Sequence, residues 1–167
     1  MSKTKQRESF GGDAMTRVAK ILAPIDFSSG SEASVAYAAA LAKSLHSVVT
    51  LFHVYQFPDL MESIVPGADN AMDAEKDRAC AQQWLEKIGE ETRKRTDIQT
   101  HVVVVQGSPA REIIAFSRNG GFDMIVMGTH GRTGLQRVVM GSVAEAVVRG
   151  ARCPVLTIHL PLPGQMA

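Results

Sequence analysis

Short apolar runs alternate with longer, partly polar segments along the chain. Residues 18–25 and 48–55 are nearly continuous apolar runs, as expected of strands that are buried on both faces. Comparable runs predict further strands over residues 101–105, 122–127 and 154–159. The hydrophobic pattern therefore predicts five buried strands.

Helix signals occupy the segments between these runs. A capping-box pattern at Ser29 predicts a helix over residues 29–45. The serine–proline pair at 108–109 predicts the start of another helix, which ends near Gly120. A short helix is expected over residues 142–149.

A longer helix is expected over residues 69–95. Within it Cys80, Trp84 and Ile88 recur every four residues, with Ala81 and Leu85 alongside, so we expect this stripe to face the core. The second cysteine, Cys153, precedes the last predicted strand, and we expect both thiols to be buried and reduced.

This alternation of strands and helices predicts an α/β fold, with an open, doubly wound, parallel five-stranded sheet and four helices. The length of 167 residues fits one domain. We expect this domain over residues 17–160, between flexible tails at 1–16 and 161–167.

Composition excludes little but points away from two partner classes. The net charge is +1, with 21% charged and 45% hydrophobic residues, so nothing indicates a nucleic acid or a membrane surface as partner. The first 16 residues are polar and match neither a signal peptide nor a spanning helix. We expect a cytoplasmic protein.

The most informative connection follows the fourth predicted strand. Ligands of such sheets bind beyond the carboxyl ends of the strands, where the strand order reverses. Here the connection from Gly128 to Ser142 is longer than usual and holds Gly131 and Gly141, with Arg132 nearby. Glycines let backbone amides approach an oxyanion, and a helix N-terminus favours phosphate. The alternative is that Ser142 only caps its helix, in a capping box, within a purely structural loop.

Two other candidate residues also leave alternatives open. Asp26, at the end of the first strand, could contact a ribose or cap the following turn. His130 could act in catalysis or lie in solvent, and no second acid or base stands beside it at a recognisable spacing. The chain has no P-loop signature and no Gly-x-Gly-x-x-Gly after its first strand. Its five histidines show no metal-site spacing.

The spacing Gly128-x-x-Gly131, nine residues, Gly141-Ser142 resembles the nucleotide-binding signature of the universal stress protein family. The resemblance extends over about residues 18–159. It includes four segments that match the family's first, second, third and fifth strands: Ile-Leu-Ala-Pro-Ile-Asp-Phe-Ser at 21–28, Leu-Phe-His-Val at 51–54, Val-Val-Val-Gln-Gly-Ser-Pro at 103–109 and Cys-Pro-Val-Leu at 153–156.

The resemblance implies a fold like the adenine nucleotide alpha hydrolases and a homodimer formed through the last strand, about residues 154–159. It also implies binding of ATP or another adenine nucleotide, with Mg or Mn bridging the phosphates. The residues that would hold ribose, adenine and phosphates are Pro24, Asp26, Val54, Met127, Gly128, Gly131, Arg132, Gly141, Ser142 and Val143. Ala144 departs from relatives that carry threonine there, and the lost hydroxyl is worth about 0.5–1.5 kcal/mol of binding.

Two function classes remain at this point. The first is a nucleotide-gated regulatory module of the stress response, in which any hydrolysis is weak. The second is a slow ATPase or nucleotide phosphotransferase that uses His130 or Arg132 on the phosphates. A weaker third interpretation is a scaffold that holds no ligand.

Overall fold

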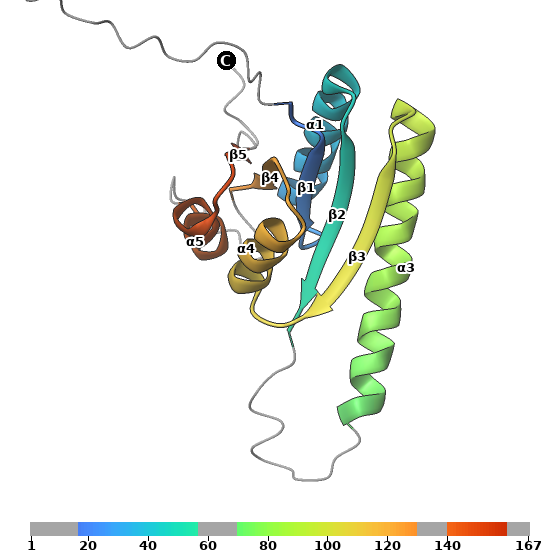
Figure 1. Ribbon diagram of the computed structural model, residues 1–167. Helices are drawn as coiled ribbons and strands as arrows, with labels where there is room; N and C mark the ends of the chain where they lie inside the picture. Colours follow the sequence, from blue (N-terminus) through green and yellow to red (C-terminus); the bar gives the residue numbers. More distant parts are fainter. Residues whose placement is uncertain (1–16, 57–69, 130–139, 160–167) are drawn as a thin grey trace, which may run out of the picture.

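The computed structural model describes residues 17–56, 70–129 and 140–159, in which strands and helices alternate along one parallel sheet. The sheet order is β3-β2-β1-β4-β5 (Figure 1). The described elements are β1 Lys20–Ile25, α1 Ser29–Leu45, β2 Val48–Tyr55, α3 Asn70–Thr96, β3 Thr100–Gln106, α4 Pro109–Asn119, β4 Met124–Gly128, α5 Ser142–Gly150 and β5 Val155–Ile158. All four strand pairings are parallel, which confirms the predicted α/β architecture.

The helices form one layer on each face of the sheet. Figure 1 shows α1 and α3 on one side of the sheet and α4 and α5 on the other. Alternate residues of β1 serve the two layers, because Ile21 and Ala23 belong to the core under α1 and α3 whereas Leu22 belongs to the core under α4 and α5. Burial on both faces is the reason for the continuous apolar runs of the sequence.

Small side chains let α1 approach the sheet closely. Val35, Ala38, Ala39 and Ala42 are all buried, as its alanine-rich face predicts. The helix spans the predicted residues, but its N-cap is Ser28 and not Ser29. Ser28 Oγ accepts a hydrogen bond from the Ser31 amide at 3.3 Å. Adjacent serines give the same sequence signal, and the turn before the helix decides which of them caps it.

Helix α3 faces the core with only part of the predicted stripe. Leu85 is fully buried and Ala81 nearly so, whereas Trp84 is 56% exposed and Cys80 is exposed. The predicted stripe is therefore confirmed at Ala81 and Leu85 and wrong at Cys80 and Trp84, and the expectation of a buried thiol was wrong for Cys80. The buried and the exposed positions differ by one residue, about 100° around the helix, and apolar side chains occupy both. The described cysteines are free, as expected.

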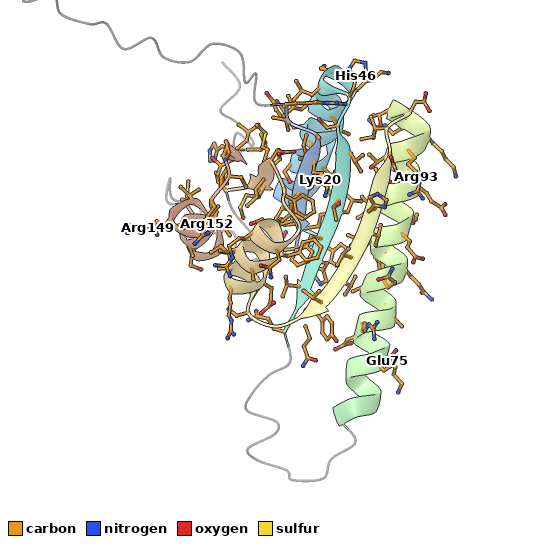
Figure 2. All side chains as sticks on the ribbon, in the orientation of Figure 1. Lys20, His46, Glu75, Arg93, Arg149 and Arg152 are labelled. Atoms are coloured by element: carbon orange, nitrogen blue, oxygen red, sulfur yellow. The ribbon has the colours of Figure 1, made fainter. Side chains whose placement is uncertain are left out.

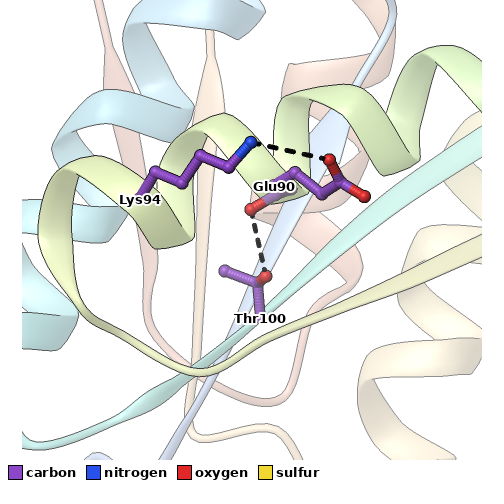
Figure 3. A network of polar contacts seen from close by, with 4 residues as sticks. Glu90, Lys94 and Thr100 are labelled. Carbon is purple, nitrogen blue, oxygen red and sulfur yellow. Dashed lines mark hydrogen bonds and ion pairs between the residues drawn. The ribbon is translucent and has the colours of Figure 1, made fainter.

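Polar contacts attach the end of α3 to the start of β3. Thr100 Oγ1 donates to the Gly89 carbonyl at 3.4 Å, while Lys94 and Glu90 pair at 4.0 Å on the outer side of the same turns (Figure 3). Arg93 Nη1 donates to Thr100 Oγ1 at 2.9 Å. Figure 2 shows Arg93 in this end of the molecule, where the strands begin. Basic residues in the last turn also complement the helix dipole.

Candidate functional site

The strand order reverses between β1 and β4, and this places the candidate site. Chain connections leave β1 toward β2 on one side, while β4 and β5 lie on the other. We call the edge of the sheet where the strands end the carboxyl edge; it lies after Ile25, Tyr55 and Gly128. Parallel sheets of this type bind ligands at this position.

Three predicted site residues lie in one apolar cluster on the α4/α5 side of the sheet. Met127 is 5% exposed and part of that core, and the half-buried side chains of Val54 and Val143 pack against it. They come from β4, β2 and α5. Pro24 is buried in β1 opposite Phe52 of β2. The fold therefore brings Val54 and Val143, which are 89 positions apart in the sequence, into one cluster.

Asp26 shapes the turn that leaves β1. Its Oδ1 accepts hydrogen bonds from the Ser28 amide at 3.1 Å and from Ser28 Oγ at 2.6 Å. This is the turn-capping geometry that aspartate favours after a strand. The structure thus shows the capping role of Asp26, and the same bonds fix the direction of its carboxylate at the carboxyl edge.

The residue between these partners has a strained backbone. Phe27 has φ 62°, a left-handed conformation that costs a residue with a Cβ about 1–2 kcal/mol. Its ring lies 4.6 Å from the ring of His53 on β2, centroid to centroid. His53 Nδ1 in turn lies 2.7 Å from the carbonyl oxygen of Ile25. Sequence analysis missed this arrangement, because it depends on the register that sets Ile25 beside His53.

The two ends of the glycine-rich connection are held together. The Gly141 amide donates to the Thr129 carbonyl at 2.8 Å, and the Thr129 amide donates to the Ile158 carbonyl at 3.0 Å. The start of α5 is thereby fixed beside the end of β4. Thr129 is a second residue that sequence analysis missed, since its position directly after a strand was the only signal.

Helix α5 begins without a side-chain cap. Its N-cap is Gly141, so the alternative in which Ser142 caps the helix was wrong, and no side-chain cap bond occurs at this end. Ser142 is the first residue of the helix and is exposed. The first intrahelical bond runs from the Glu145 amide to the Gly141 carbonyl at 2.9 Å, so the amides of residues 142–144 have no intrahelical acceptor. Such a helix start attracts anions.

Comparison with known proteins shows to which family the chain belongs. The model of the universal stress protein family matches residues 18–159. The chain belongs to this family. Universal stress protein MJ0531 of Methanocaldococcus jannaschii is 32% identical over 149 residues, which cover 85% of this chain and 82% of the relative.

Solved structures of universal stress proteins share the fold. The structure of MJ0577 from Methanocaldococcus jannaschii, described as a structure-based assignment of biochemical function, has a TM-score of 0.75 and 28% identity, covering 88% of this chain and 99% of that one. A universal stress protein from Archaeoglobus fulgidus in complex with dAMP has a TM-score of 0.55 and 19% identity, covering 84% and 97%. At the latter identity the likeness concerns the fold alone.

Several predicted residues of this universal stress protein fall outside the described part. Gly131, Arg132 and His130 belong to the connection 130–139, for which no position is described. Gly128 ends β4 and lies opposite Ile158 of β5. Among the described residues, no group of three or more His, Cys, Asp and Glu side chains could hold a metal ion. No helix in the described ranges is long and apolar enough to cross a membrane.

Proposed function

We propose that this universal stress protein binds ATP or a related adenine nucleotide at the carboxyl edge and acts as a nucleotide-gated module of the stress response. The observation that carries the proposal is the meeting of two features at one place. The ends of β1, β2 and β4 adjoin the uncapped start of α5, whose Gly141 amide is bonded to Thr129. The strand ends suit a nucleoside, and the helix start suits phosphates.

The residues present fit such a ligand. Asp26 would accept hydrogen bonds from ribose hydroxyls, the backbone around Val54 would contact the adenine, and Pro24, Met127 and Gly128 would line the same pocket. The phosphates would be held through backbone amides, one hydroxyl and one guanidinium, from Gly131, Arg132, Gly141, Ser142 and Val143. Mg²⁺ or Mn²⁺ would neutralise phosphate charge when bound with the nucleotide. The chain belongs to a family of which one solved member is a complex with dAMP, and this membership supports an adenine nucleotide as the ligand class.

The proposal includes a homodimer in the cytoplasm. Strand β5 is at one end of the described sheet order, and its four residues are half-buried. A second copy that pairs along residues 154–159 would cover this edge. Free cysteines suit a reducing compartment such as the cytoplasm. Light scattering should give a mass near twice the 18.0 kDa of one chain, and a monomer mass at micromolar concentration would contradict the dimer.

Calorimetric titration tests the nucleotide proposal. Ligand-stripped protein is titrated with ATP, ADP and AMP, each with and without Mg²⁺. We expect micromolar ATP binding that weakens as phosphates are removed, because each phosphate adds contacts to the start of α5. Flat titrations with a sample that is folded by circular dichroism would refute the proposal.

A further inference from the structure

We propose that His53 is a positioning residue, which sets the turn at residues 26–28 and thereby aims the Asp26 carboxylate at the nucleotide. This inference rests on the proposed function, because it concerns how one of the proposed ligand contacts is oriented. His53 itself lies on β2 and is half-buried. Its contacts run through the backbone and the side chain on either side of Asp26.

The first contact holds the backbone before Asp26. His53 Nδ1 lies 2.7 Å from the carbonyl oxygen of Ile25, the last residue of β1. A carbonyl only accepts hydrogen bonds, so Nδ1 carries the proton and donates it. The bond fixes the peptide that joins Ile25 to Asp26. It links residues 28 positions apart in the sequence, between β2 and the neighbouring β1, which borders the switch point.

The second contact holds the residue after Asp26. The rings of Phe27 and His53 lie 4.6 Å apart with an interplanar angle of 43°. Phe27 has φ 62°, a conformation that persists in a bulky residue only when its surroundings impose it. Packing of its ring on His53 is one such constraint. Local strain of this kind gathers at ligand sites, where it preorganises a contact.

The two contacts converge on the carboxylate. With the backbone fixed on both sides, Asp26 Oδ1 meets both the amide and the hydroxyl of Ser28, and Ser28 Oγ in turn caps α1 through the Ser31 amide. A His53 side chain that only filled space would need neither the donor at Nδ1 nor the ring on Phe27. The position of the donor can therefore be tested separately from the bulk of the side chain.

Three substitutions at His53 separate these roles. In His53→Asn the amide nitrogen can occupy the place of Nδ1 and keep the bond to Ile25, although the ring is lost. In His53→Phe the ring is kept without a donor, and in His53→Gln the donor is displaced along the side chain. ATP affinity is measured by calorimetry for each, and again in an Asp26→Asn background, with circular dichroism to check folding.

We expect His53→Phe and His53→Gln to weaken ATP binding about three- to tenfold, the range for one lost hydrogen bond, and His53→Asn to lose less. In the Asp26→Asn background all three should have almost no further effect, because they act through that carboxylate. A loss that persists undiminished without the carboxylate, or a His53→Asn variant as weak as His53→Phe, would overturn the positioning role alone. A wild-type protein that binds no adenine nucleotide would instead refute the proposed function, and with it this inference.

Discussion

Replacing Ser142 by alanine tests whether its hydroxyl serves the ligand or the helix. Ser142 is the first residue of α5, is exposed, and follows the N-cap Gly141, at which no side-chain cap bond occurs. A capping serine contributes about 1 kcal/mol to the free energy of unfolding. In a chain of this length that loss would lower Tm by about 2–4 °C. Because Ser142 does not cap, and alanine favours helix more than serine does, we expect Tm to be unchanged or slightly higher.

The effect on binding should be large. A hydroxyl that donates to a charged phosphate contributes about 1.5–3 kcal/mol, so Ser142→Ala should weaken ATP binding by about tenfold or more. Calorimetry with ATP and a thermal melt without ligand measure the two quantities separately. AMP should be affected less than ATP, since it lacks the outer phosphates.

Two control variants come from α1. Ser28→Ala removes a cap that accepts a bond from Ser31, and should lower Tm by about 2–4 °C. Ser29→Ala changes the exposed first residue of that helix, the position equivalent to Ser142, and should leave Tm unchanged. If Ser142→Ala lowered Tm as far as Ser28→Ala does and left ATP affinity intact, our account of α5 would be wrong.

Three further predictions concern the scaffold. Leu85→Ala should destabilise the fold by about 2–5 kcal/mol in a denaturant titration, whereas Trp84→Ala should cost under about 1 kcal/mol. Equal losses would contradict the burial of Leu85 and the exposure of Trp84 on α3. Burial, and to a lesser extent the charge of Asp123, raises the pKa of Cys153, so less of this thiol is present as thiolate. Iodoacetamide at pH 8 should therefore label the exposed Cys80 first, and faster labelling of Cys153 would contradict this prediction. Asp123→Ala removes an acceptor of two backbone amides before and at the start of β1 and should lower Tm by several degrees; an unchanged melt would show those bonds to be unimportant.

Much of the architecture could be predicted from the sequence because burial on both faces leaves a strong local signal. Strands that are covered on two sides read as continuous apolar runs, and the five runs match the five described strands to within two residues at each end. The carboxyl edge follows from the topology, so the sequence alone assigns Asp26, Val54 and Gly128 to one region.

The errors arose where neighbouring residues carry equal signals. Ser28 and Ser29 are both capping residues, and only the Asx-type turn at Asp26 selects the first. Trp84 and Leu85 are both apolar, and the approach of α3 to the sheet decides which of them is buried. The contact of His53 with Ile25 depends on strand register, a long-range property that local patterns do not specify.

Hydrogen–deuterium exchange of the whole chain, with and without ATP and Mg²⁺, maps where an adenine nucleotide binds. We predict that ATP slows exchange at residues 24–28, 54–56, 127–129 and 141–144, and leaves the middle of α3 unchanged. Slowed exchange confined to other elements, or none at saturating ATP, would show that no adenine nucleotide binds across the carboxyl edge.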